Sequence, residues 1–176
     1  MNRKTKYIAY TALFTALTLV LQVATAPFGQ LVTGSAVNFV LIAVCLLIGL
    51  RSAITVAVVA PIAASLIGIG SGMLQLVPVI IIGNAVFVSV FALVIRIMKK
   101  LNRILSNTAA LLISSAAKYA SLYIGVLKIA VPMLGLPEKA AAKLSASFGV
   151  IQLFTALIGG ALAMVTVPLI KKAIKR

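Results

Sequence analysis

Long apolar segments, each about as long as a bilayer crossing, constrain this chain more than any other feature. A transmembrane helix needs about 20 mostly apolar residues, and runs of that kind recur along the sequence, for example over residues 76–98. The chain is 63% hydrophobic and only 10% charged, whereas a soluble domain is about half apolar and about a quarter charged. We therefore expect an all-α integral membrane protein.

The alternation of apolar runs and breaks predicts one membrane domain, residues 1–176, built as a compact bundle of six transmembrane helices. The predicted spans are 7–23, 35–50, 52–69, 76–98, 108–132 and 142–170. Residues 25–33, with Pro27 and Gly29, are predicted to form the first outer loop. Gly68, Gly70 and Gly72 are expected to break a helix rather than to cradle a phosphate.

The basic residues predict the orientation of the bundle. Lys and Arg collect on the cytoplasmic side of membrane proteins. Six spans with a cytoplasmic N-terminus place twelve of them inside and only Lys139 and Lys143 in outer connections. Both termini are then cytoplasmic, and the chain is expected in the plasma membrane of a bacterium.

Composition also excludes several functions. The chain has no His, one Cys and one acidic residue, Glu138, which leaves no plausible metal centre, no cofactor site and no catalytic acid–base pair. We therefore expect no enzymatic activity. The net charge of +15 lies in short clusters between apolar runs, a pattern typical of topology signals and not of nucleic-acid binding.

Amide side chains at membrane depth suggest a ligand pocket. Asn38 opens the second predicted span, and Asn84 and Gln152 lie about eight and ten residues from the outer ends of the fourth and sixth. A rise of 1.5 Å per residue puts the latter two roughly 12–15 Å deep. Each amide alone could equally form an interhelical hydrogen bond, but as a set at one level they favour a pocket.

Two lysines and a tyrosine of the fifth span are further candidate ligand contacts. Lys118 lies near the middle of that span, where a cation costs about 2.5–3.5 kcal/mol, and no intramembrane carboxylate could pair with it. Lys128 could instead extend toward the membrane surface. Tyr123 adds a hydroxyl and a ring, although anchoring at the membrane interface is equally plausible. Lysines with amides suit a small ligand that carries a carboxylate, phosphate or carbonyl group.

Small residues on the first helix suggest a contact with another protein. Ala12 and Ala16 form an Ala-x-x-x-Ala pair, which places both on one helix face and lets a second helix approach closely. Internal packing would be the simpler explanation. With the basic N-terminus, the Pro/Gly outer loop and six helices in under 200 residues, this pair makes the chain resemble the substrate-binding S component of energy-coupling factor (ECF) vitamin transporters.

The resemblance implies a division of labour between subunits. The Ala pair would contact a transmembrane coupling (T) subunit, which sits on two cytoplasmic ATPase subunits, and the first outer loop would cap a site for a vitamin or vitamin precursor. Such partners would supply the energy that a chain with one carboxylate and no phosphate-binding loop cannot. Two alternatives remain: a stand-alone facilitator driven by the substrate gradient, and a membrane scaffold without transport activity.

Overall fold

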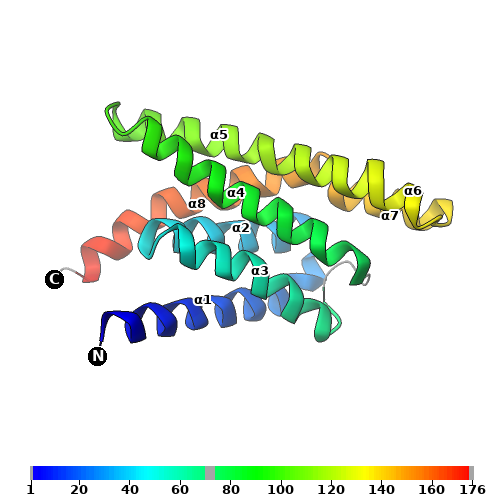
Figure 1. The fold of residues 1–176 in the computed structure, drawn as a ribbon, viewed down its shortest axis with the longest axis horizontal. Helices are drawn as coiled ribbons and strands as arrows, with labels where there is room; N and C mark the ends of the chain where they lie inside the picture. The colour runs from blue at the N-terminus through cyan, green and yellow to red at the C-terminus, as the bar shows by residue number, and fades with distance from the viewer. Residues whose placement is uncertain (1, 70–73, 175–176) are drawn as a thin grey trace.

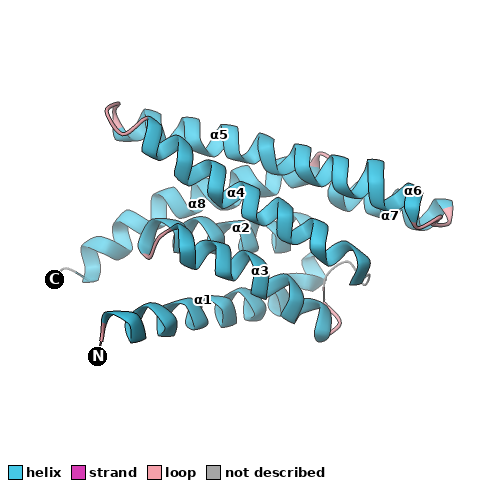
Figure 2. Ribbon diagram, viewed as in Figure 1, coloured by secondary structure: helices cyan, strands magenta, loops and turns pink. Residues whose placement is uncertain are grey.

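A computed structural model describes residues 2–69 and 74–174 of the chain. Gly70 and Gly72 of the predicted glycine break, and the terminal Lys175 and Arg176, lie outside the described residues. Throughout the described part the chain forms helices joined by short connections, with no strand (Figure 2). The prediction of an all-α protein is thus confirmed.

The helices are long and mostly consecutive. Their bounds are α1 (Arg3–Thr25), α2 (Gly29–Leu47), α3 (Leu50–Leu66), α4 (Val77–Ile97), α5 (Arg103–Leu122), α6 (Val131–Met133), α7 (Glu138–Phe148) and α8 (Ile151–Ile174). Two single turns of 3₁₀ helix, η1 (Ala26–Phe28) and η2 (Leu74–Leu76), precede α2 and α4. A π-helical segment, η3 (Tyr123–Ala130), joins α5 to α6.

Several helical segments are suited to a bilayer. Within the described residues, four are long and apolar enough to cross one: Lys4–Leu47, Leu74–Ile97, Arg103–Met133 and Glu138–Ala173. The first of these contains both α1 and α2, and the shorter α3 is also apolar. Many large apolar side chains on all sides of the molecule are exposed. Such a surface fits a protein embedded in lipid.

The long helices run back and forth along one common direction (Figure 1). In that view α1 and α3 lie on one side and α4 and α5 on the other, while α2 and α8 lie behind them, and the two termini meet at the same end. The second helix is central, because it contacts α1, α3, α4 and α8. Its residues 40–44 are at most 2% exposed, as expected for a helix that is apolar on every side.

A close approach of α2 and α8 fixes one wall of the bundle. A Cβ atom added to Gly159 of α8 would overlap the carbonyl oxygen of Ser35 and lie 2.6 Å from the amide nitrogen of Phe39. On the α2 side, a Cβ at Gly34 would lie 2.9 Å from Thr155. Small residues permit this backbone contact, as is common between membrane helices, and the contact sets the position of the polar residues beside it.

The prediction of a loop over residues 25–33 is wrong, because the structure has helix there. The chain reverses within η1 and Gly29, whose φ of +80° suits a residue without a Cβ, and α2 begins there instead of at residue 35. Pro27 is compatible with helix because it lies in the first turn of η1, where its missing N–H is not needed.

The last two predicted spans also differ in detail. The fifth begins at Arg103, because the Asn102 side chain accepts a hydrogen bond from the backbone N–H of Ile104 and caps the helix. The sixth, predicted as one helix over 142–170, is divided into α7 and α8 at Gly149, where φ is −81° and ψ −142°. A side chain at Gly149 would collide with the carbonyl oxygen of Ser145, so glycine suits this break.

Candidate functional site

A large cavity lies at the end of the bundle opposite the termini. It has a volume of about 670 Å³, within the range of about 300–1,000 Å³ typical of small-molecule sites. Its walls come from the last turn of α1, the first halves of α2 and α4, the last part of α3, the end of α5, and α7 with the start of α8. The break at Gly149 places α7 as a separate element along one side of this cavity.

Lys118 of α5 is the deepest charged group of the cavity wall. The side chain is only 3% exposed, and its Nζ donates hydrogen bonds to Oδ1 of Asn38 at 2.6 Å and to Oδ1 of Asn84 at 2.7 Å. The Phe87 ring centroid lies 5.3 Å from the same nitrogen, within reach of a cation–π contact. Three helices therefore converge on one ammonium group without supplying a carboxylate.

The chemistry of lysine fixes which way the two amides face. An ammonium group only donates hydrogen bonds, so each amide must present its oxygen to Lys118 and keep its NH₂ group for other partners. The Nδ2 of Asn38 donates to Oγ1 of Thr155 at 3.2 Å. The donors that remain are one N–H of Lys118, the second N–H of the Asn38 amide and the NH₂ of Asn84. The Lys118 cluster (Lys118, Asn38 and Asn84) therefore offers donors to the cavity and favours an electron-rich group.

The helix break supports a second polar group on the cavity wall. Gln152 is 4% exposed, and its Nε2 donates to the carbonyl oxygen of Ser147 at 2.8 Å, across the break. A break leaves carbonyls of the preceding helix without helical partners, and this side chain satisfies one. Thr155, one turn further on, is fully buried and donates to the Gln152 carbonyl at 3.0 Å. The amide oxygen of Gln152 remains as an acceptor at the cavity wall.

The charge of the cavity wall is positive. Lys143 of α7 joins Lys118 among the lining residues, and no acidic residue of the described part of the chain lines the cavity. The α7 helix also contributes Leu144 and Phe148, both buried, to the wall. Thr33 lines the same space, and its buried Oγ1 has no hydrogen-bond partner within the described residues. This hydroxyl therefore has unused hydrogen-bonding capacity beside the cavity.

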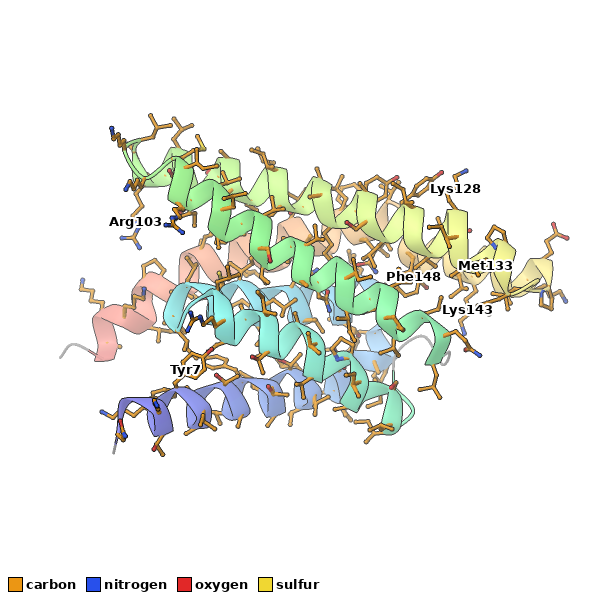
Figure 3. All side chains as sticks on the ribbon, viewed as in Figure 1. Tyr7, Arg103, Lys128, Met133, Lys143 and Phe148 are labelled. Carbon is orange, nitrogen blue, oxygen red and sulfur yellow. The ribbon has the colours of Figure 1, made fainter. Side chains whose placement is uncertain are left out.

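The structure brings four of the predicted ligand contacts to this cavity: Asn38, Asn84, Lys118 and Gln152. Lys128 and Tyr123 are not among its lining residues. Lys128 is exposed on the outer side of the bundle (Figure 3), with Nζ 5.6 Å from the Tyr123 ring centroid. Tyr123 lies 5.7 Å from the Tyr119 ring centroid. These two residues form their own surface contact, and we remove them from the candidate site.

Sequence reasoning missed Thr33 and Lys143, which line the cavity, and Thr155, which does not line it but accepts a hydrogen bond from Asn38. Thr155 could have been found from its spacing, because residues three apart in a helix share a face with Gln152. Thr33 was assigned to a loop that the structure replaces with helix. Lys143 was read only as an outer charge, and its position on the cavity wall depends on the break at Gly149.

Ala12 and Ala16 lie on the outer surface of α1, where both are exposed. The opposite side of the helix faces the bundle. There Thr18 is fully buried, and Oγ1 of Thr11 lies 2.8 Å from Oγ of Ser52 in α3. The alanine pair therefore has no part in internal packing, and both small side chains remain on the exposed side of α1.

Comparison with protein-family models, with curated proteins and with solved structures finds no match to this chain.

Proposed function

We propose that this protein is the substrate-binding S component of an ECF-type importer and takes up a small vitamin or vitamin precursor. The observation that carries the proposal is the Lys118 cluster at the wall of a 670 Å³ cavity. A buried cation held only by amides is costly in a membrane protein unless it serves a ligand. The cavity, its lining and the exposed alanine pair fit the resemblance that the sequence suggested.

In this proposal the chain crosses a bacterial plasma membrane six times, with both termini in the cytoplasm. The crossings are made by α1, α2, α3, α4, α5 with its extension through α6, and α7 with α8. The two termini lie at one end of the bundle, which supports an even number of membrane crossings (Figure 1). The cavity then opens toward the outer face, where a substrate arrives.

The substrate would be small and would carry a carboxylate, a phosphate or a ring carbonyl. Lys118 and the NH₂ group of Asn84 would bind that group, since both offer donors to the cavity. The Gln152 oxygen would accept from a second polar group of the substrate. Lys143, on α7, would contact the substrate from the side of the outer opening.

The energy for release inside would come from partner proteins. Ala12 and Ala16 would contact a transmembrane coupling subunit, and two cytoplasmic ATPase subunits would drive it. The exposure of both alanines supports this role, because a partner helix can reach them. A chain whose single acidic residue is Glu138, exposed at the start of α7, has no carboxylate in its core for a coupling ion.

Two experiments test the proposal. Native mass spectrometry of the purified protein should detect one small molecule carried over from the host. If this protein neither carries nor binds any small metabolite, it is a scaffold and not a transporter subunit. Affinity purification from the native host should recover ATPase subunits, which Ala12→Trp should abolish by blocking the approach of a partner helix. Leu17→Trp, on another exposed side of α1, is the control. Ligand binding without ATPase subunits would identify a facilitator instead.

A further inference from the structure

A second cavity lies at the other end of the bundle, near the termini. It has a volume of about 310 Å³ and lies between the turn that joins α4 to α5 and the last part of α8. Lys99, Arg103 and Lys171 line it. Figure 3 shows Arg103 at this end, between that turn and α8. This cavity is separate from the candidate substrate site and shares no lining residue with it.

No side chain of the described residues balances the charges of this basic cavity. No acidic residue lines it, and the single acidic residue of the chain, Glu138, begins α7 at the opposite end of the bundle (Figure 1). Three like charges around one small space repel one another, so an external anion would stabilise the arrangement. The first turn of α5 also begins here, and the positive end of its dipole adds to the attraction.

Hydrogen bonds hold the basic cavity in shape. The Nζ of Lys171 donates to the carbonyl oxygen of Leu46 at 2.8 Å, which ties α8 to the last turn of α2. The Oγ of Ser106 donates to the carbonyl oxygen of Met98 at 2.6 Å and ties α5 back to the turn before it. Arg103 lies one helical turn before Ser106, so its backbone is positioned by the same contact. Asn107 adds an amide to the lining.

Lipid-facing side chains surround the basic cavity. Part of its wall is apolar, from Leu46, Ile95, Met164 and Val167. Large apolar side chains exposed around the same turn are Ile97, Leu101, Ile104 and Leu105. A ligand that fits both features has an anionic head and apolar chains. Basic pockets between membrane helices on the cytoplasmic side are known to hold anionic phospholipid headgroups.

We propose that the cavity between the α4–α5 turn and α8 binds the phosphate group of an anionic phospholipid through Arg103, Lys99 and Lys171. The lipid chains lie along the exposed apolar side chains of the turn. This site is independent of the proposed transport function, and it would be occupied whatever small molecule the larger cavity binds.

Native mass spectrometry of the delipidated protein in detergent tests the site. Phosphatidylglycerol is titrated against phosphatidylcholine with the same acyl chains, and we expect the anionic lipid to bind at least about tenfold more tightly, since each cation near the headgroup contributes about 1 kcal/mol. Equal binding of the two lipids would overturn the proposal. Inorganic phosphate is the third probe. If it stabilises the protein against heat as much as phosphatidylglycerol does, the anion is a soluble one and the lipid assignment is wrong.

Matched substitutions locate the site. Lys99→Gln/Arg103→Gln removes two cations of the basic cavity, and Lys100→Gln/Lys172→Gln removes two exposed cations next to it that do not line it. We expect the first pair to weaken phosphatidylglycerol binding by more than about tenfold and the second pair to change it by less than about threefold. An equal loss in both variants would show diffuse attraction to a basic surface and would overturn the proposal.

Discussion

Replacing Lys118 with methionine separates ligand binding from stability at the candidate site. Methionine has a similar length but no charge and no donor. The substitution leaves the Oδ1 atoms of Asn38 and Asn84 without the partner that binds them at 2.6 Å and 2.7 Å. Each unsatisfied buried acceptor costs about 1–3 kcal/mol. Removing a cation from the membrane interior returns about 2.5–3.5 kcal/mol. The net change in the free energy of unfolding should therefore lie between a gain of about 1.5 kcal/mol and a loss of about 3.5 kcal/mol.

The same substitution should always weaken ligand binding, whereas its effect on stability can have either sign. A hydrogen bond from a charged group contributes about 1.5–3 kcal/mol, which corresponds to a loss of about 10- to 150-fold when the donor is removed. The assay is native mass spectrometry, which measures how much of the purified protein retains its carried-over small molecule. Lys128→Met is the matched control, because Lys128 belongs to the same apolar helical segment but is exposed and does not line the cavity. Unchanged occupancy in Lys118→Met, or an equal loss in Lys128→Met, would refute the assignment.

An apolar version of the whole cluster distinguishes binding from folding even if the single variant is unstable. Lys118→Met combined with Asn38→Leu and Asn84→Leu removes the charge together with both of its acceptors. Replacing a buried polar group set with apolar residues is often neutral or stabilising, by about 1–4 kcal/mol. The triple variant should thus unfold at the wild-type temperature or above and carry no ligand. A large loss of stability would mean that the cluster serves the fold.

Two further predictions concern packing and orientation. Gly159→Ala should lower the free energy of unfolding by about 1–3 kcal/mol or more, because its Cβ meets the α2 backbone. Gly160→Ala should cost less, since its Cβ meets one leucine side chain that can rotate. Equal thermal shifts would contradict the close α2–α8 contact. In a Cys45→Ala background, a cysteine at Glu138 should react with a membrane-impermeant maleimide in intact cells, and one at Lys172 only after permeabilisation. The reverse pattern would place the termini outside.

The sequence predicts the helices well, because the apolar runs that form them are local. The breaks are less predictable. Gly149 carries no local signal that separates it from the other glycines of the apolar runs, and its effect depends on the Ser145 carbonyl, which leaves no room for a Cβ at this position. In the opposite sense, Pro27 and Gly29 predict a loop, yet the 3₁₀ turn η1 contains Pro27 and Gly29 begins α2. Turn-forming residues show where the chain can bend, and packing determines how sharply.

The depth of a residue along a helix can be calculated from the sequence, but the side of the helix on which it lies depends on the local helix geometry. The rise per residue was enough to place Asn84 and Gln152 at similar levels. The turn of about 100° per residue would also have excluded Tyr123, although not Lys128. Tyr123, five residues after Lys118, lies about 140° around the helix from it, and Lys128, ten residues after, about 80°. The π-helical segment between them shifts the later positions again, and only the three-dimensional structure reveals that shift.

The single acidic residue of the chain has a physical consequence at the Lys118 cluster. A carboxylate beside Lys118 would neutralise its charge and use its remaining donor. The two amide oxygens instead satisfy two of its protons and leave the positive charge in place, because an amide is neutral. The arrangement therefore keeps its attraction for an anion. A site that must bind and later release a charged or carbonyl-bearing ligand benefits from this arrangement, because no internal carboxylate competes for the cation.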